Sequence, residues 1–484
     1  MDIAYIGAGH VGLVSAACMA ACGHRVRVYD VDEDRTSALR AGMVPFFEPG
    51  LEELLALGRS TGRLSFHHQP TEALPPARLI FICVGTLNGP DGGVDLSGVV
   101  SATLAVAEHA SPHTVLVNRS TSPVGTADYI RSLLEEAGRD ISVAVNPEFL
   151  AEGTALRDFL VPDRLVIGSG DRSAIERILH AYASIVHRRG LPAPVEEIRD
   201  AIDRATEPVP VTVMKPPTAE LTKYAANAFL AVKISFINEI ASVAEEVGAD
   251  VSEIARAVGL DHRIGPHFLR AGIGWGGSCF PKDIQALQGL AETYGLEGLM
   301  LRAANAVNLE QRRWVARRLQ RHLKTLHGRR VGLLGLAFKA NTDDLRNAPA
   351  LEIAEELARL NVRVRAYDPA VRALPPEPAR FIELTASAEE AAREADALVL
   401  VTEWPEFRAL DLHELRAQMR TPLLLDGRNH LDPEAARRAG FRYMGVGRDD
   451  HDVWATEPRD RWSETPLGGG QGTPRVAGVR VESR

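Results

Sequence analysis

The sequence has 484 residues, of which 45% are hydrophobic and 25% are charged, so the chain is long enough to form more than one packed domain. Its formal net charge of −9 and the lack of a basic block argue against a nucleic-acid-binding surface. The four cysteines are too few for a disulfide framework, and they fit the reducing environment of the cytoplasm.

Strand and helix patterns alternate from the N-terminus. Residues 1–35 are typical of a strand, a glycine turn, a helix and a second strand, and buried-strand patterns follow at 79–85, 114–120 and 141–147. This alternation predicts an α/β fold with a parallel sheet. The chain enters its first strand without a basic leader, which argues against a signal peptide, and no run of 18 apolar residues predicts a membrane span.

The remainder of the chain predicts a helical segment and then a second sheet. A long apolar-periodic helix is expected at 217–247, and a second helical region is expected at about 283–326, with a break near Gly295 and Gly298. Strand patterns then resume and recur at 362–369, 397–404 and 421–429. The predicted boundaries are 1–212 with a peripheral insertion at about 187–212, 213–326, 327–454, and a disordered tail at 455–484.

The first glycine turn fits a dinucleotide-binding motif. Gly7, Gly9 and Gly12 follow the G-x-G-x-x-G spacing, and Asp30 ends the next strand pattern. Such glycines allow a tight turn and let a diphosphate approach the N-terminus of a helix. An acid at the position of Asp30 favours NAD over NADP, because it accepts hydrogen bonds from the ribose hydroxyls. The same glycines would also suit a plain turn in another doubly wound sheet.

One cysteine is a candidate nucleophile. Cys279 follows two glycines and a serine, and Pro281 suits the first turn of a helix. A helix N-terminus and the adjacent Lys282 are both expected to lower the pKa of the thiol. Asp283 could orient a water molecule or act as a base, although a small residue in a glycine turn is the simpler reading of Cys279. The other cysteines fall in apolar patterns and are expected to be inert core residues: Cys18, Cys22 and Cys83.

Two pairs of polar residues are four positions apart. Lys223 and Asn227 share one face of the predicted apolar helix, where they would stabilise a developing alkoxide or serve as base and hydrogen-bond donor. Glu148 and Glu152 follow the strand at 141–147, and Thr121 follows the preceding strand, at the carboxyl edge where open α/β sheets bind ligands. Solvent-exposed helix faces are the alternative for both pairs.

These residues lie in segments that resemble the UDP-glucose/GDP-mannose dehydrogenase family over about residues 1–450. The matching segments, in chain order, are GAGHVG, FICVGT, RSTSPVGT, NPEFLAEGTALRDFLVPDRLVIG, AELTKYAANAFLAVKISFINEI, RIGPHFLRAGIGWGGSCFPKD and GLAFKANTDDLRNAP. Trp275 departs from the family pattern, which has phenylalanine or tyrosine there, and the insertion at 187–212 is longer than usual.

The resemblance implies two Rossmann-like, doubly wound parallel-sheet domains joined by a central helical dimerisation domain. It also implies a four-electron oxidation of a nucleotide sugar by two NAD, with no metal, in a cytoplasmic homodimer that binds neither nucleic acid nor membrane. The segment at 149–164 resembles the UDP-glucose branch, whose product is UDP-glucuronate. GDP-mannose and UDP-N-acetylmannosamine are alternative substrates, and a catalytically silent nucleotide-binding regulator is an alternative of another class.

The resemblance also assigns roles to individual residues. The implied catalytic residues are Cys279, Lys223, Asn227, Asp283, Thr121, Glu148 and Glu152. The implied NAD contacts are Gly7, Gly9, His10, Val11, Gly12, Asp30, Arg35, Thr86, Thr121, Glu152, Lys282 and Arg346. The implied substrate contacts are Glu148, Phe149, Leu150, Ala151, Glu152, Lys223, Asn227, Phe268, Leu269, Arg270, Ala271, Gly272, Gly276 and Lys339, together with Arg263 from a second subunit.

Overall fold

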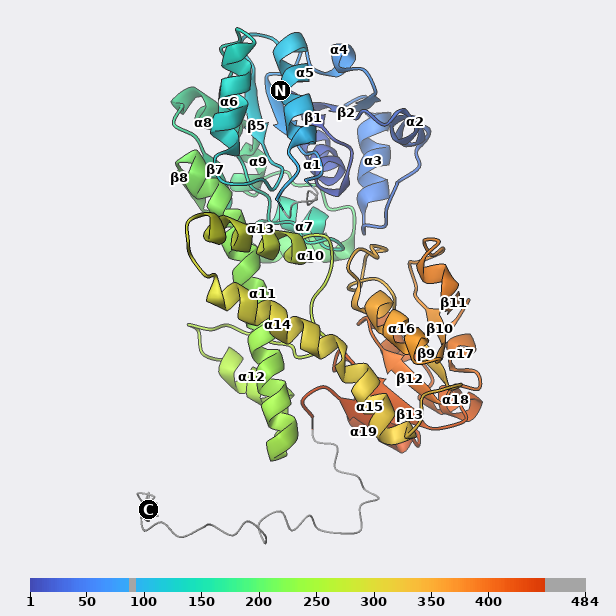
Figure 1. The fold of residues 1–484 in the computed structure, drawn as a ribbon. Helices are drawn as coiled ribbons and strands as arrows, with labels where there is room; N and C mark the ends of the chain where they lie inside the picture. The colour runs from blue at the N-terminus through green and yellow to red at the C-terminus, as the bar shows by residue number, and fades with distance from the viewer. Residues whose placement is uncertain (87–92, 449–484) are drawn as a thin grey trace, which may run out of the picture. The chain divides into compact units, whose positions relative to one another are not determined.

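The computed structural model describes residues 1–86 and 93–448 (Figure 1). The tail expected at 455–484 lies outside the described residues, as does the end of the third expected domain, from 449 onward. The described chain holds two sheets and, between them in the sequence, a helical region.

The first sheet has the strand order β3-β2-β1-β4-β5-β6-β7-β8. Its strands are parallel except where β6 meets β7. The strands are β1 (Asp2–Ile6), β2 (Arg25–Tyr29), β3 (Leu64–His67), β4 (Leu79–Ile82), β5 (Val115–Asn118), β6 (Ser142–Val145), β7 (Leu165–Gly168) and β8 (Val211–Met214). The helices of this part are α1 (His10–Ala21), α2 (Glu33–Ala41), α3 (Leu51–Ser60), α4 (Pro70–Ala73), α5 (Ser97–His109), α6 (Thr126–Glu136), α7 (Ala155–Leu160), α8 (Arg172–Ala181), α9 (Ala183–Val186) and α10 (Glu196–Arg204).

Apolar side chains cover both faces of this sheet. In β4, Leu79 and Phe81 belong to one hydrophobic cluster, whereas Ile80 and Ile82 belong to the cluster on the other face. Successive side chains of a strand point to opposite faces, so an all-apolar strand indicates helices on both sides of the sheet. The alternation of strands and helices along the sequence therefore corresponds to the expected parallel sheet with helices on both faces.

The segment at 187–212 is less peripheral than expected. It contains α10, and Ile198 of this helix is buried in the core of the first sheet. Its last residues begin β8, which pairs with β7 and extends the sheet. The strand escaped the sequence analysis because β8 is only half-buried and exposes Val213, so it lacks a buried-strand pattern.

The helical region begins with α11 (Pro216–Val247), which is the longest described helix and runs through the centre of the ribbon in Figure 1. It is followed by α12 (Val251–Gly259), α13 (Phe280–Thr293), α14 (Leu299–Arg312) and α15 (Trp314–Leu323). Among the described helices, α11 alone is long and apolar enough to cross a membrane by length and composition. It packs against α13 and α14 and buries several polar side chains, which is the behaviour of a core helix.

The second sheet is entirely parallel, with the order β11-β10-β9-β12-β13-β14. Its strands are β9 (Arg330–Leu334), β10 (Arg363–Tyr367), β11 (Ile382–Leu384), β12 (Ala397–Leu400), β13 (Leu423–Asp426) and β14 (Arg442–Gly445). Its helices are α16 (Pro349–Arg359), α17 (Ala388–Ala392), α18 (Leu412–Gln418) and α19 (Pro433–Arg438). The predicted fold class, two doubly wound α/β sheets separated by helices, is confirmed.

Candidate active site

The glycine turn after β1 leaves the N-terminus of α1 open to a ligand. Gly7 has a φ of +104°, and a Cβ on Gly12 would lie 2.0 Å from the carbonyl oxygen of Gly7, so neither position tolerates a side chain. Gly9 is the N-cap of α1, and no side chain caps this end of the helix. The first amides of α1 therefore remain available to an anionic diphosphate.

Asp30 lies directly beside this turn. Its carboxylate accepts hydrogen bonds from the backbone N–H of Ala8 (2.6 Å) and of Asp32 (2.9 Å). Arg35 donates to the same carboxylate at 3.4 Å. The acid, the arginine and the glycine turn are thus brought together as the sequence predicts.

The ends of β4 and β5 meet at the same edge of the sheet. The hydroxyl of Thr86 donates to the backbone oxygen of Thr121 at 2.6 Å, and Ser120 donates to the backbone oxygen of Val84 at 2.8 Å. Val11 lies in the first turn of α1. The predicted NAD contacts of the first sheet therefore gather around one edge.

Cys279 immediately precedes α13, and polar groups from α11, from α13 and from the residues after β6 act on it. Asn227 donates to Asp283 Oδ2 at 2.6 Å, and Lys282 binds Asp283 Oδ1 at 2.7 Å. The Lys223 ammonium acts electrostatically on both Cys279 and Asp283. Lys223 and Asn227 are 4% and 7% exposed, which excludes the solvent-exposed helix face considered for this pair.

Glu148 is the ion-pair partner of Lys223. Its Oε1 lies 2.9 Å from Lys223 Nζ, and both side chains are buried. Burial acts to raise the pKa of Glu148, but the Lys223 charge and hydrogen bond bring the pKa below its ordinary value. Burial acts to lower the pKa of Lys223, and the Glu148 carboxylate reverses that effect and raises it. The pair is therefore a charged one.

The expected activation of the thiol by Lys282 is wrong for the protein without ligands. Burial raises the pKa of Cys279, and the carboxylates of Glu148 and Asp283 raise it further, which outweighs the opposing Lys223 charge. Lys282 is bound to Asp283 instead of the sulfur. The N-terminal position in the helix is as expected, but local sequence could not reveal how far the sulfur is removed from water.

Glu152 belongs to a second cluster. Its carboxylate accepts hydrogen bonds from Ser278 at 3.1 Å and from Thr342 at 3.3 Å, and it contacts Arg346 at 3.3 Å. Glu148 and Glu152 are not on a helix, because α7 begins only at Ala155. The alternative of a solvent-exposed helix face is therefore excluded for this pair, and both glutamates lie near Cys279 through its neighbours.

The loop before Cys279 links α11 to the second sheet. The backbone N–H of Gly272 donates to Asn238 Oδ1 at 2.8 Å, and that of Ile273 donates to Gly427 O at 2.9 Å. Leu269 and Ala271 pack in the core of the second sheet, so they can offer only backbone atoms to a substrate. The implied substrate contacts at these two positions are consequently limited to main-chain hydrogen bonds.

Comparison with known proteins identifies the family. Residues 1–186, 217–310 and 332–433 match the NAD binding domain, the central domain and the UDP binding domain of the UDP-glucose/GDP-mannose dehydrogenase family. The chain belongs to this family. It is thus a nucleotide-sugar dehydrogenase whose first sheet binds NAD and whose second sheet belongs to a UDP binding domain.

Full-length relatives support this assignment. The chain is 43% identical to a UDP-glucose 6-dehydrogenase of Pseudomonas aeruginosa over 93% of this chain and 98% of the relative. It is similar to the structure of a UDP-glucose dehydrogenase from Pyrobaculum islandicum, with 38% identity, 92% and 97% coverage, and a TM-score of 0.81. It is also similar to the structure of a UDP-D-ManNAc dehydrogenase from Pyrococcus horikoshii, with 29% identity, 93% and 100% coverage, and a TM-score of 0.78.

Two charged residues join the site of this dehydrogenase although the sequence analysis did not select them. Arg428, after β13, donates to Gly274 O at 2.8 Å and so holds the cysteine loop. Glu48 accepts hydrogen bonds from the backbone N–H of Gly153 at 2.6 Å and of Ala155 at 2.8 Å. The Asp-Gly-Arg run at the end of a predicted strand was a usable signal for Arg428, whereas Glu48 has no comparable local signal.

Lys339 and Arg263 lie differently with respect to the site. Lys339 is close enough to Glu152 for their charges to interact, and burial lowers the pKa of its ammonium. Arg263 is exposed and binds Asp261 at 2.6 Å, and no contact within the described ranges joins it to Cys279. Within one chain of the dehydrogenase, Lys339 thus lies at the site and Arg263 lies outside it.

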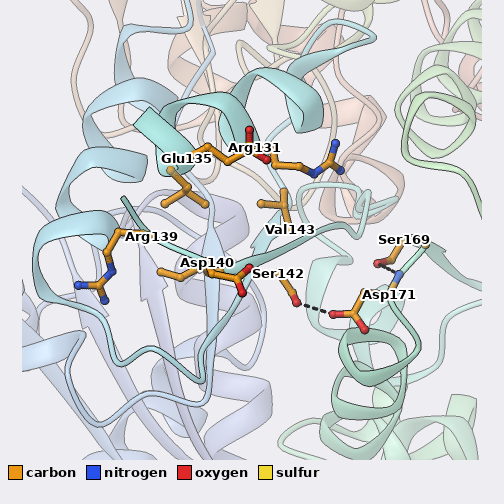
Figure 2. Close-up of a pocket in the computed structure, with 11 residues that line it drawn as sticks. Arg131, Glu135, Arg139, Asp140, Ser142, Val143, Ser169 and Asp171 are labelled. Carbon is orange, nitrogen blue, oxygen red and sulfur yellow. Dashed lines mark hydrogen bonds between the residues drawn. The ribbon is translucent and has the colours of Figure 1, made fainter. Parts of the chain in front are cut away.

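Two pockets flank the NAD-binding part of the dehydrogenase. One, of about 450 Å³, is lined by residues that include His10, Glu152 and Arg346, and therefore opens onto the predicted cofactor contacts. The other, of about 350 Å³, is lined by Arg139 and by residues at the start of β6, the opposite end of that strand from Glu148 (Figure 2). In it, Ser142 donates to Asp171, and the hydroxyl of Ser169 accepts the backbone N–H of Asp171.

Proposed function

We propose that this chain oxidises UDP-glucose to UDP-glucuronate through a thioester on Cys279. Relatives along the whole chain are UDP-glucose 6-dehydrogenases, which supports UDP-glucose as the substrate. One CH₂OH group, one water and two NAD⁺ give one carboxylate, two NADH and three protons. Bound NAD serves as the hydride acceptor in each oxidation.

The arrangement of charges around Cys279 carries the proposal. Lys223 is held charged by Glu148, so it can stabilise an alkoxide at the sugar C6 oxygen while the first hydride leaves that carbon. The Cys279 sulfur then adds to the aldehyde carbon as the C=O double bond opens and the thiol proton passes to the oxygen. The carbon becomes tetrahedral and bears a second transferable hydride. Asn227 has its amide directed by Asp283 and assists in polarising the same oxygen.

Loss of the second hydride leaves a thioester, which water must hydrolyse. Glu152, aided by Thr121 and Asp283, accepts a proton from the water as its oxygen attacks the carbonyl carbon. The carbon–sulfur bond then breaks, and the sulfur regains a proton. The attachment of Ser278 to Glu152 supports this role, because it places the carboxylate next to the residue that precedes Cys279.

We also propose that the chain acts in the cytoplasm as a homodimer assembled through the central domain at 213–326. One exposed face of α11 carries three large apolar side chains that a partner would cover: Phe229, Phe236 and Val243, which are 65%, 51% and 55% exposed. Arg263 would then contribute to the site of the partner, which agrees with its distance from the site within one chain. Domain boundaries near 212 and 326 complete this proposal.

Two alternatives receive less support. A related sugar such as UDP-N-acetylmannosamine or GDP-mannose would use the same chemistry, but the relative named for UDP-D-ManNAc is less similar, at 29% identity against 43%. A silent nucleotide-binding regulator would not need the Asn227–Asp283 hydrogen bond or a Lys223 charge that acts on Cys279.

The decisive experiment assays UDP-glucose, GDP-mannose and UDP-N-acetylmannosamine separately and counts the NADH formed per sugar consumed. We expect two NADH per sugar and the highest kcat/KM with UDP-glucose. A ratio of one would contradict the thioester route, because it would mean that the reaction stops at the aldehyde. Preference for another sugar would overturn the substrate assignment alone.

A further inference from the structure

Glu152 shares its arginine with a second carboxylate from the other sheet. Arg346 binds Asp344 Oδ2 at 2.6 Å and contacts Glu152 Oε1 at 3.3 Å. The side chains of both acids are only 11% exposed, whereas that of Arg346 is 62% exposed. Two mostly buried acids thus lie beside each other and share one partly exposed cation.

Asp344 holds Arg346 more tightly than Glu152 does. The guanidinium Nε lies 2.9 Å from each carboxylate oxygen of Asp344, and the backbone N–H of Arg346 also donates to Asp344 at 2.9 Å. Glu152 has only the single 3.3 Å contact with this arginine. The arginine therefore stabilises the ionised form of Asp344 more than that of Glu152, and the Glu152 carboxylate receives less compensating positive charge.

The charges of the two acids follow from this asymmetry. Burial acts to raise the pKa of Asp344, but its hydrogen bonds with Arg346 bring the pKa below its ordinary value. Burial raises the pKa of Glu152, and the neighbouring Asp344 charge raises it further. The other charged or hydrogen-bonding groups that face Glu152 are His10, Lys339, Arg346, Ser278 and Thr342.

We propose that Asp344 is a positioning residue that acts through Glu152, keeping this carboxylate ready to accept the proton of the hydrolytic water. The inference rests on the proposed function, in which Glu152 is the base. Asp344 follows β9 of the second sheet, whereas Glu152 belongs to the part of the chain that forms the first sheet. A residue of the second sheet domain thus acts on the proposed base of the first. A base works best when its pKa lies near the working pH, and a neighbouring negative charge moves a carboxylate in that direction.

Infrared titration of the protein without ligands tests the inference directly. The protonated carboxyl band that is lost in Glu152→Gln reports on Glu152, and its change with pH gives the midpoint. In Asp344→Asn we expect this midpoint to fall by about one pH unit, because a like charge has been removed. A midpoint that stays in place or rises would overturn the proposal.

Further variants control for misfolding and for general charge effects. Arg346→Gln removes the opposite charge, so the Glu152 midpoint should rise. If Asp344→Asn fails to fold, Asp344→Ala removes the same charge and carries the same test. Asp343→Asn removes an equal charge one residue away, from a side chain that accepts the Phe47 N–H at 3.1 Å, and should leave the midpoint in place. A shift in Asp343→Asn equal to that in Asp344→Asn would contradict a specific role for Asp344.

The pH profile of turnover links the titration to catalysis. We expect the acidic limb of kcat for acid formation to move to lower pH in Asp344→Asn, with a lower maximal rate because Glu152 becomes a weaker base. A limb that does not follow the infrared midpoint would contradict the link to Glu152. If the wild type produced only one NADH per sugar, the proposed function would fail, whereas the ligand-free titration would still decide the effect of Asp344 on Glu152.

Discussion

The turn that follows the central strand is built alike in the two sheets. Gly7 donates its N–H to Tyr29 O at 2.8 Å in the first sheet, and Gly335 donates to Tyr367 O at 2.7 Å in the second. Each sheet then places an aspartate, Asp30 or Asp368, just after the strand that supplies the acceptor. The strand orders around these turns also correspond, from β3 to β6 and from β11 to β14.

The chain leaves the two turns differently. In the first sheet α1 begins at His10, directly at the turn, whereas in the second sheet α16 begins only at Pro349. The intervening residues 335–348 carry the groups that reach Glu152: Lys339, Thr342, Asp344 and Arg346. The first turn thus presents a helix N-terminus to a ligand, and the second extends a loop toward the catalytic residues.

The two aspartates differ accordingly. Asp30 accepts two backbone N–H groups and one weaker contact from Arg35. Asp368 accepts four backbone N–H groups and the indole N–H of Trp404 at 3.1 Å. A carboxylate has about four lone-pair positions, so Asp368 is saturated by the protein. One turn design can therefore serve ligand binding in one sheet and the anchoring of a loop in the other.

The largest expected effect lies in neither turn. Replacing Cys279 with alanine should lower the rate of UDP-glucuronate formation by about 10³-fold or more, because the covalent intermediate cannot form. Binding of NAD and of the nucleotide sugar, measured by calorimetry, should be retained, since both sheets remain intact. The control Cys22→Ala alters the cysteine directly after α1 and should keep normal turnover. Normal acid formation by Cys279→Ala would contradict the covalent route.

The next largest effect is a difference in protein stability between variants of Asp368 and Asp30. Asp368→Asn should lower the free energy of unfolding by about 3 kcal/mol. The substitution replaces one carboxylate oxygen with an NH₂ group, so the buried N–H groups that donate to that oxygen lose their acceptor. Denaturant unfolding followed by circular dichroism measures this loss. Asp30→Asn should cost about 1 kcal/mol, since fewer donors depend on it. Equal losses in the two variants would break the proposed contrast.

The smallest effect concerns the affinity for NAD, which should depend on Asp30 and not on Asp368. Asp30→Asn should weaken NAD binding about 10-fold, which corresponds to the loss of roughly one charge-assisted hydrogen bond to the ribose. Affinity for UDP alone should stay unchanged in this variant, as calorimetry can show. Unaltered NAD affinity would mean that Asp30 serves only the turn, as Asp368 does.

Much of the fold was accessible from the sequence, because its signals are local. The all-apolar strand β4 and the glycine turn predict a parallel sheet from adjacent residues alone. The strand β8 was not accessible, since Val211–Met214 is half-exposed and its strand character comes from pairing with β7.

The sequence indicated several residues that the structure brings together, but it indicated little of their geometry and missed Arg428 and Glu48. Four-residue spacing correctly placed Lys223 and Asn227 on one face of α11. For Glu148 and Glu152 the sequence left a helix face open as the alternative and could not show their partners. The Glu148 carboxylate accepts the N–H of Leu150 and pairs with distant Lys223, and the second of these contacts depends on tertiary structure. Likewise, the environment of Cys279 depends on residues far away in the chain.

The raised pKa of the Cys279 thiol has a consequence for the order of events. Burial and the carboxylates of Glu148 and Asp283 outweigh the Lys223 charge, so the sulfur favours its protonated form, which reacts more slowly with electrophiles. An oxidised nicotinamide ring is cationic and a reduced one is neutral. An oxidised ring bound beside Cys279 would therefore favour the thiolate, and the nucleophile would be more reactive when a hydride acceptor is present to complete the oxidation.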